Sequence, residues 1–202
     1  MSITSPSAST TGHADPTARP HPSPRSIILR ALEPSDADLL YDVENDEAAW
    51  PSSDNIAPYS RHALREYALT HEADPFAAGQ LRLVAQVGDT QPGGTSAEQN
   101  HHRAVGLLDF YDISAIHSHA WIGIYVLPDM RGEGYGHDML LRSLDYARRH
   151  LGLTSVGARI LEGNDPSMRL FRKCGFELRG TLPCWRFADG EMRDMHLLTR
   201  RL

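Results

Sequence analysis

A glycine-rich turn between an expected strand and an expected helix is the segment best suited to chemistry. Residues 124–127 are apolar and lead through Pro128 into residues 131–136, which read Arg-Gly-Glu-Gly-Tyr-Gly. Glycines let the backbone approach a ligand closely, and the N-terminus of a helix presents N–H groups and positive potential. The segment therefore predicts an anion site, for which a pyrophosphate is the natural ligand.

Three nucleotide-binding patterns compete for this turn. A P-loop ends in Gly-Lys-Ser/Thr, but here Gly136 is followed by His137 and Asp138. A dinucleotide fingerprint places its third glycine three residues after the second, whereas Gly134 and Gly136 are two apart, and no acid ends a following strand at the expected distance. The third pattern, Arg131 followed by Gly134 and Gly136, fits better than the other two.

That third pattern, Arg131-x-x-Gly134-x-Gly136 after a strand, resembles the coenzyme A pyrophosphate loop of the GNAT N-acetyltransferase superfamily. Residues 164–176 resemble the second motif of that family, with the Asn, the small residue, the aromatic, the Lys and the closing Gly-Phe in order. The resemblance spans residues 27–202 and is tightest over 121–176. It implies an acetyl-CoA-dependent N-acetyltransferase of GNAT fold, with acetyl-CoA as co-substrate.

Within the superfamily, residues 29–36, 176–180 and 190–194 look like the ribosomal-protein and polyamine acetyltransferases. This grouping implies a primary amine as acceptor, with a diamine or polyamine such as spermidine as the best choice. Two alternatives stay open. One is a protein acceptor, at an N-terminal amine or a lysine, and the other is an acyl-CoA-binding module without turnover.

The resemblance also implies a set of cofactor-binding residues. Backbone groups of the glycine loop would hold the pyrophosphate, the end of the preceding strand would pair with the pantetheine, and the second motif would contact the arm. Outer phosphates would meet Arg169, Arg172 or Lys173, unless these are solvated surface charges. The residues expected on this ground are Val126, Leu127, Arg131, Gly132, Glu133, Gly134, Tyr135, Gly136, Asn164, Ser167, Phe171 and Lys173.

Transfer to an amine also requires a proton acceptor, because an alkylammonium of pKa near 10 is mostly charged at neutral pH. Residues 31–60 contain eight acids and no Lys, Arg or His, and in this family the segment covers the acceptor pocket. The candidates for the general base and for contact with the substrate are Glu33, Glu44 and Glu47. For each of them the alternative is a solvated charge on the surface of a helix. Trp50 is a further candidate for contact with an ammonium.

The leaving thiolate needs a proton as well, and here the sequence departs from the family. Many members carry a tyrosine where this chain has Phe171, which we place beside the sulfur. Water, Tyr111, Tyr125 or Tyr135 would then be the proton source, and the sequence does not choose among them. The main-chain N–H near Tyr125 would polarise the thioester carbonyl.

Alternating and helical periodicities predict the elements that must position these residues. The expected order is βααβββαβαββ, an α/β (α+β) fold with a mixed sheet of about seven strands. The resemblance implies that this is the GNAT fold, in which the central strands splay apart. Ser35 or Asp36 would cap the first helix and Ser60 the second. Residues 26–202 form one domain in this interpretation, residues 1–25 a disordered tail, and residues 88–102 an exposed loop insertion.

Composition narrows the remaining classes. A net charge of −6 argues against a nucleic-acid partner, and no apolar run reaches the roughly 18 residues of a membrane span. The N-terminus lacks a signal-peptide core, so we expect a cytoplasmic protein. His117 and His119 lack an identifiable third ligand, so no metal site is predicted. A homodimer stays open, because nothing in the sequence specifies an interface.

Overall fold

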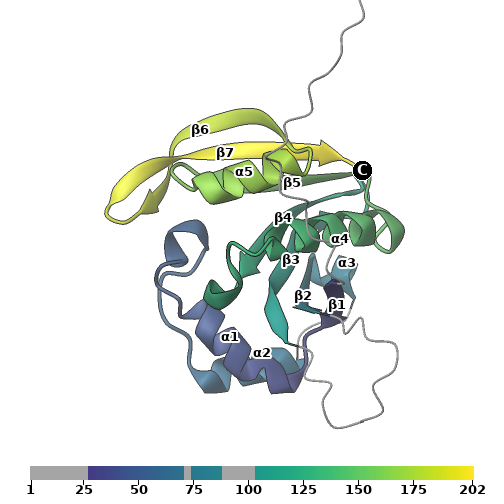
Figure 1. Ribbon diagram of the computed structural model, residues 1–202, viewed down its shortest axis with the longest axis vertical. Coiled ribbons are helices and arrows are strands. Elements are labelled where there is room, and N and C mark those ends of the chain that lie inside the picture. The colour runs from purple at the N-terminus through teal and green to yellow at the C-terminus, as the bar shows by residue number, and fades with distance from the viewer. Residues whose placement is uncertain (1–26, 71–73, 88–102) are drawn as a thin grey trace, which may run out of the picture.

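The computed structural model describes residues 27–70, 74–87 and 103–202 (Figure 1). The predicted tail and the predicted loop insertion lie outside these ranges. The described strands are β1 (Ile27–Ala31), β2 (Gln80–Val87), β3 (Ala104–Ser114), β4 (His119–Val126), β5 (Ser155–Leu161), β6 (Glu177–Ala188) and β7 (Glu191–Arg201). The helices are α1 (Ala37–Glu44), α2 (Arg61–Thr70), α3 (Pro75–Ala78), α4 (Tyr135–Arg149) and α5 (Asp165–Lys173). The 3-10 turns are η1 (Pro34–Asp36), η2 (Trp50–Ser52) and η3 (Pro128–Met130).

The chain order agrees with the predicted one except for α3, a helix of four residues that the sequence analysis missed. The seven strands form one sheet in the order β1-β2-β3-β4-β5-β7-β6, which confirms the predicted mixed α/β fold. No helix in the described ranges is long and apolar enough to cross a membrane.

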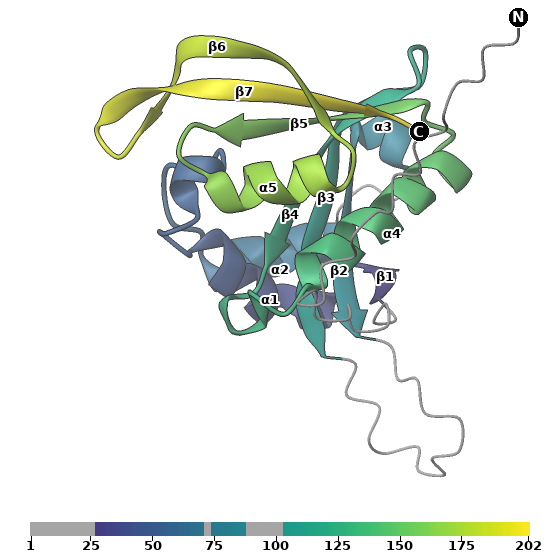
Figure 2. The same cartoon turned by 45° about the horizontal axis from the view of Figure 1, so that its top comes forward.

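Helices cover both faces of the sheet. In Figure 2, α4 and α5 lie in front of the strands and α1 and α2 lie behind them. The alternation of β3 explains this arrangement, because Leu107 is buried with α1 and α2 whereas Leu108 and Phe110 are buried with α4. On α4, Leu140 and Leu144 lie at helical spacing and belong to the same core as Phe110. The strands at the centre are therefore apolar on both faces, as their sequences predict.

The pairing of β4 with β5 is short and sets the position of the site. These two strands are parallel neighbours only at His119–Ser155, Ala120–Val156 and Trp121–Gly157, so they diverge after residues 121 and 157. We call this the β4/β5 divergence, and it confirms the predicted splayed central strands. At its start, a Cβ on Gly157 would lie 2.5 Å from the Trp121 ring, so the indole fills the space of a side chain there.

The expected helix caps are borne out at one helix only. Ser60 Oγ accepts from the N–H of Ala63, as predicted for α2. Asp36 precedes α1 but makes no capping hydrogen bond there, which corrects the expected cap. Its buried carboxylate instead accepts from Arg30 Nη1 at 2.6 Å, from Arg30 Nη2 at 2.7 Å and from the N–H of Glu33 at 2.8 Å.

The Asp36 carboxylate therefore joins β1 to the turn before α1, and its titration should be visible in folding. Burial disfavours the charged form, but the hydrogen bonds from Arg30 and Glu33 outweigh it, so the pKa of Asp36 is lowered. We expect Asp36→Asn to lower the free energy of unfolding at pH 7 by about 1–3 kcal/mol. A carboxylate with a lowered pKa in the folded state contributes stability above its unfolded pKa and loses this contribution as pH falls through its folded pKa. The difference in free energy of unfolding between the wild type and Asp36→Asn should therefore become smaller in acid.

Urea unfolding at pH 7 and at progressively lower pH measures this difference. Asp38→Asn is the matched control, because Asp38 pairs with Arg61 on the surface and its side chain is 83% exposed. Exposed pairs contribute little to stability, so the control should change little. Equal losses in the two variants would contradict the assigned role of Asp36.

Candidate active site

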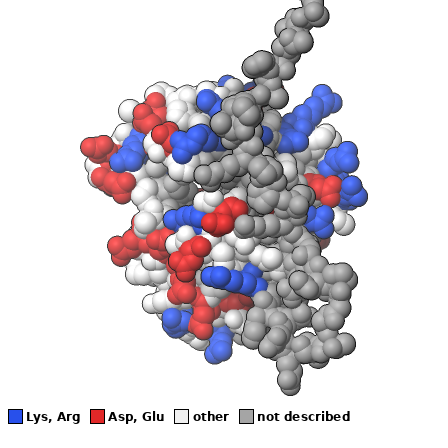
Figure 3. Space-filling model, in the orientation of Figure 1, with Lys and Arg blue, Asp and Glu red and all other residues white. Residues whose placement is uncertain are grey.

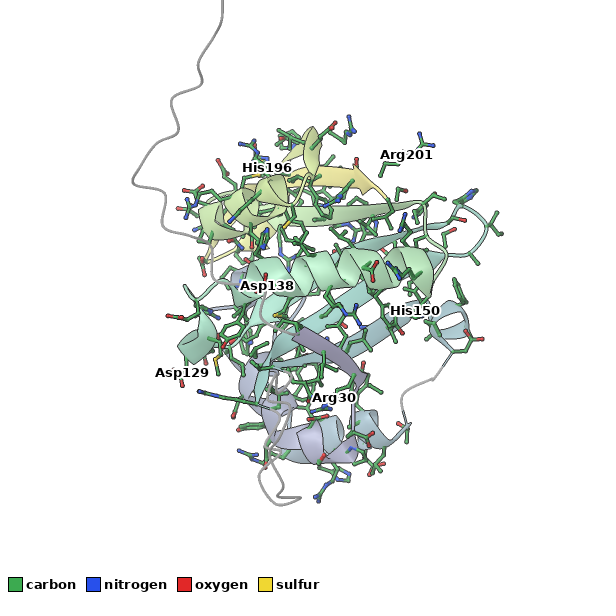
Figure 4. All side chains as sticks on the ribbon, turned by 45° about the vertical axis from the view of Figure 1, so that its right-hand side comes forward. Arg30, Asp129, Asp138, His150, His196 and Arg201 are labelled. Atoms are coloured by element: carbon green, nitrogen blue, oxygen red, sulfur yellow. The ribbon has the colours of Figure 1, made fainter. Side chains whose placement is uncertain are left out.

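The predicted anion loop has the backbone of an anion-binding turn. Gly132 and Gly134 have φ of 81° and 89°, and Gly134 is the N-cap of α4. No atom lies within 4 Å of a Cβ built on either, so it is the left-handed backbone, and not crowding, that favours glycine. Figure 4 shows Asp129 and Asp138 at this end of α4, before and after the loop. Helix N-termini present N–H groups and positive potential, so this end of α4 is suited to an anion.

The third glycine of the loop brings the two sequence motifs together. A Cβ on Gly136 would lie 3.3 Å from a methyl carbon of Val126 on β4 and 3.3 Å from one of Leu170 on α5. Such contacts are tighter than most real Cβ contacts, so the absence of a side chain lets α4 pack closely on both elements. The loop, the end of β4 and the second motif therefore form one continuous site.

The register decides which main-chain groups of β4 face the divergence. The N–H of Leu127 donates to Val105 O on β3 at 2.9 Å, whereas Ser118 O accepts from Thr154 N beside β5 at 2.7 Å. Successive residues of a strand point their main-chain groups to opposite edges, so those of Ile124 and Val126 face β5. Those of Tyr125 and Leu127 face β3.

This register removes Leu127 from the main-chain groups that were expected to pair with the pantetheine. Leu127 uses its only donor inside the sheet, and its carbonyl accepts from the N–H of Met130 at 2.8 Å. The N–H of Tyr125 itself points toward β3, but that of its neighbour Val126 points toward the divergence, so an N–H near Tyr125 that polarises the thioester stays a prediction. Of the two residues expected to pair with the pantetheine, Val126 is the one whose main chain faces the divergence, and its carbonyl accepts from Arg131 Nε at 3.0 Å. Sequence alone does not give the edge that an amide faces, because register sets it.

The second motif forms α5, with its residues in three distinct environments. Asn164 is the N-cap and accepts from the N–H of Ser167 at 3.2 Å. Its Nδ2 donates to Ser52 Oγ in η2 at 3.2 Å, a contact that joins α5 to the segment between α1 and α2. Lys173 is exposed at the C-terminal end of the helix. Phe171, which we expected beside the sulfur, is 4% exposed and packs edge-on against Phe176 in the core.

Residues 45–60, which we call the α1–α2 link, are held in place by Glu44. The main-chain O of Glu44 accepts from Trp50 Nε1 at 2.9 Å and from Asn55 Nδ2 at 3.0 Å. Its carboxylate accepts from Asn55 Nδ2 at 2.7 Å and from Arg82. Glu44 and Trp50, both predicted to contact substrate, are thus brought together as parts of a scaffold.

Arg82 extends this scaffold into the sheet. Its Nε donates to the Asp109 carboxylate on β3 at 2.9 and 3.0 Å, while its Nη1 donates to Glu44. The side chains of Arg82, Glu44 and Asp109 are only 18%, 13% and 22% exposed. Burial disfavours the charged guanidinium, but the two carboxylates outweigh it and raise the pKa of Arg82. The sequence analysis missed this network. The positive charge of Arg82 and the negative charge of Asp109, each inside an apolar strand, could have indicated it.

Asp46 makes the contact that joins the α1–α2 link to β4 and the glycine loop. Tyr125 Oη donates to Asp46 Oδ2 at 2.5 Å, and Arg131 Nη2 lies 3.7 Å from the same oxygen. Burial and the hydrogen bond to Asp46 raise the pKa of Tyr125 to about 12. The Arg131 guanidinium also lies 5.3 Å from the centre of the Tyr125 ring.

The remaining acidic candidates lie apart from this contact. Glu47 is exposed on the α1–α2 link, and Glu33 is exposed before η1. The eight residues of α1, a length of about 12 Å, separate Glu33 from the end where Glu44 and Asp46 lie. Sequence reasoning named the two exposed glutamates and missed Asp46. In the described ranges, no three His, Cys, Asp or Glu side chains are grouped as metal ligands.

Comparison with known proteins agrees with this geometry. The Acetyltransferase (GNAT) domain family matches residues 26–177. A spermidine N(1)-acetyltransferase of Vibrio cholerae is 28% identical over 176 residues, covering 84% of this chain and 89% of that protein. A spermidine N(1)-acetyltransferase of Escherichia coli is 22% identical, covering 86% and 84%.

Among solved structures, the Vibrio cholerae spermidine N-acetyltransferase in complex with CoA and spermine has the same fold. Its TM-score is 0.73 at 23% sequence identity, and the match covers 87% of this chain and 95% of that one. Together with the family match and the paired motifs around α4 and α5, these likenesses show that the chain belongs to the GNAT acetyltransferase family and is an acetyl-CoA-dependent N-acetyltransferase.

Proposed function

We propose that this enzyme acetylates a primary amine of a diamine or polyamine, with spermidine as the best acceptor. The observation that carries the proposal is the acidic surface of α1 and the α1–α2 link beside the β4/β5 divergence, where Figure 3 shows acidic side chains gathered. Asp42, Glu47 and Asp54 are exposed members of this surface. Such a surface attracts a polycation and raises its local concentration. Similarity to spermidine acetyltransferases supports the same acceptor class.

The residues around the divergence fit acetyl-CoA as the co-substrate. The amides of residues 131–136 would hold the pyrophosphate, because two left-handed glycines lead directly into the N-terminus of α4, which favours an anion. The main chain of Val126 would pair with the pantetheine, and Asn164 and Ser167 would lie along it at the start of α5. Acetyl-CoA then supplies a thioester that is already activated toward a neutral amine.

A substitution at Gly134 tests this assignment of the loop. Alanine at φ 89° is strained by about 1–2 kcal/mol, so the loop of Gly134→Ala should shift and misdirect its amides. Gly152→Ala is the matched control, because Gly152 has φ 63° in open space at the other end of α4. We expect Gly134→Ala to weaken CoA binding about tenfold or more, and the control to leave it nearly unchanged. Equal effects in calorimetric titrations would contradict the assignment.

The chain also offers a proton acceptor for the ammonium. Tyr125 Oη would accept one proton from the substrate nitrogen while its own proton passes to Asp46 Oδ2 along their 2.5 Å hydrogen bond. The nitrogen keeps the electron pair of the broken N–H bond and becomes nucleophilic, and Asp46 becomes a neutral acid that returns its proton to solvent. Glu44 serves as a positioning residue in this scheme, because Arg82 and Asn55 already hold its carboxylate.

The second proton of the nitrogen balances the reaction. As the amide forms, that proton leaves the nitrogen and reaches the departing thiolate through water. Phe171 has no proton to give and is buried in the core, so it takes no part in this step. Alignment of the two substrates across the divergence supplies the rest of the acceleration.

Thiol release from acetyl-CoA, followed across a panel of amines, tests the acceptor class. Spermidine, spermine, putrescine and cadaverine should stimulate release, with kcat/KM at least about tenfold above that of n-butylamine, since a second ammonium gains from the acidic surface. Peptides with a free N-terminal amine or a lysine form the comparison arm. No stimulation by any polyamine would overturn the proposal, and stimulation by peptides alone would assign a protein acceptor.

A further inference from the structure

One cation and two aromatic rings lie together at the start of the β4/β5 divergence. Trp121 on β4 and Tyr111 on β3 are paired neighbours, on the face of the sheet that α1 and α2 cover (Figure 2). The Arg159 guanidinium on β5 lies 4.4 Å from the centre of the Trp121 ring and 5.5 Å from that of the Tyr111 ring. We call these three side chains the Arg159 cluster. The proton relay of Tyr125 and Asp46 does not use it.

The neighbours of Arg159 explain the position of its guanidinium. The Trp121 indole lies over Gly157 on β5, and Arg159 is the next residue on that face of the strand. Its Nη2 donates to Asp112 Oδ2 at 2.9 Å. The faces of aromatic rings attract cations, so Arg159 fills a position that suits an ammonium group. Its side chain is 41% exposed, so an incoming ligand can meet it there.

An extended acceptor can run along β4 from Tyr125 to this cluster. Side chains alternate along a strand, so Tyr125, Gly123 and Trp121 lie on one face of β4. Among the described residues, only Tyr111 comes within 4 Å of a Cβ built on Gly123, at 3.8 Å. The strand therefore places no side chain between the two ends of the run.

The acidic α1–α2 link reaches both ends of this run. Asp46 accepts from Tyr125 Oη at 2.5 Å, and eight residues later Asp54 lies near Tyr111. Burial raises the pKa of Tyr111 to about 12, Arg159 opposes the rise and Asp54 adds to it. Asp54 Oδ1 also accepts from Arg186 on β6 at 3.0 Å, which joins the link to the far side of the divergence. A polycation extended along β4 therefore has acids near both of its ends.

We propose that Arg159 sets the upper limit on the length of the acceptor, and this rests on the proposed polyamine acetylation. Four residues of strand, about 13 Å, separate Tyr125 from Trp121. An extended chain advances about 1.2 Å per bond, so spermidine spans about 11 Å and spermine about 16 Å between their end nitrogens. With one end nitrogen at Tyr125, the far ammonium of spermine reaches the guanidinium, and that of spermidine stops short of it.

Two effects make spermine the weaker acceptor of the two. The guanidinium repels an ammonium of like charge, and it already occupies the faces of both rings. Without Arg159, the rings of Trp121 and Tyr111 and the carboxylate of Asp112 are three groups that attract an ammonium. Arg159 is thus a specificity-determining residue that acts on long acceptors.

The ratio of kcat/KM for spermine to kcat/KM for putrescine, measured by thiol release from acetyl-CoA, tests this limit. A ratio within one variant is independent of the fraction of enzyme that is active. Arg159→Gln should raise it about tenfold, whereas Arg159→Lys, which keeps a cation, should stay close to the wild type. The same ratio for spermidine should change by less than about twofold. Arg149→Gln is the matched control, because Arg149 is an exposed partner of Asp145 on α4, on the other face of the sheet.

A change of opposite sign makes the test sharper. Asp112→Asn removes the carboxylate that partly neutralises Arg159, so it should lower the spermine ratio. Asparagine tolerates the φ of 50° at this position. An unchanged spermine ratio in Arg159→Gln, or an equal rise in Arg149→Gln, would overturn the length limit and leave the polyamine acceptor in place. No thiol release by the wild type with any polyamine would overturn the acceptor class, and the length limit with it.

Discussion

Replacing Asp46 with Asn is expected to lower kcat/KM for spermidine by about 10²–10⁴-fold, the usual contribution of general base catalysis. Asp46 receives the Tyr125 hydroxyl proton at 2.5 Å, and Asn cannot take up a proton there. Tyr125→Phe removes the other half of the relay and should cause a loss of the same order. Affinity for coenzyme A should change little in either variant, because the amides of the glycine loop are untouched.

The pH profile separates this role from simple attraction of the substrate. Without the relay, the reaction depends on amine that is already neutral, a fraction that rises about tenfold per pH unit until pH nears the amine pKa of about 10. The ratio of the wild-type kcat/KM to that of Asp46→Asn should therefore become smaller as pH rises from 6 to 9. The pKa of Tyr125 is raised to about 12, so its hydroxyl keeps its proton throughout this range.

Glu47→Gln is the matched control for Asp46→Asn. Glu47 is an exposed acid one residue away on the same α1–α2 link, and its substitution removes the same charge. We expect a small rise in KM for spermidine and a pH profile parallel to that of the wild type. If Asp46→Asn behaves in the same way, Asp46 only attracts the polycation and the proton relay is wrong.

Replacing Arg82 with Gln is expected to lower the free energy of unfolding at pH 7 by about 3–5 kcal/mol. The change leaves the largely buried carboxylates of Glu44 and Asp109 without their shared partner. Two carboxylates of like charge then remain close together with little access to water, and this is the physical reason for the expected loss. Urea unfolding at pH 7 measures it.

Two further variants make the Arg82 result specific. Arg186→Gln removes an arginine whose partner Asp54 is 97% exposed, so it should have little effect. Arg82→Met combined with Glu44→Gln and Asp109→Asn removes the three charges together and should restore most of the loss. An Arg82→Gln loss no larger than that of Arg186→Gln would mean that the network does not stabilise the fold.

The parts of the site that the sequence predicted are local in the chain. The glycine-rich turn at residues 131–136 and the helix that begins directly after it follow from residue type and short spacing. The glycine loop and the second motif also predicted that β4 and β5 diverge, because both motifs resemble a family whose fold has splayed central strands. Short-range pattern was sufficient for the cofactor side of the site.

The acceptor side was harder to predict because its contacts are long-range. Tyr125 and Asp46 are 79 residues apart in the chain, and Arg82 and Glu44 are 38 apart. Composition marked the segment as acidic but did not separate the acid that contacts β4 from those that remain in solvent. The edge that Leu127 faces followed only from the strand register.

Calorimetric titration of coenzyme A into the full chain at neutral pH tests the central claim most directly. The account predicts saturable binding of one coenzyme per chain, held by the main-chain amides that open α4, and the loss of that binding when the pyrophosphate is absent, as with pantetheine alone. Pantetheine binding as tightly as coenzyme A, or no binding of coenzyme A at all, would contradict it.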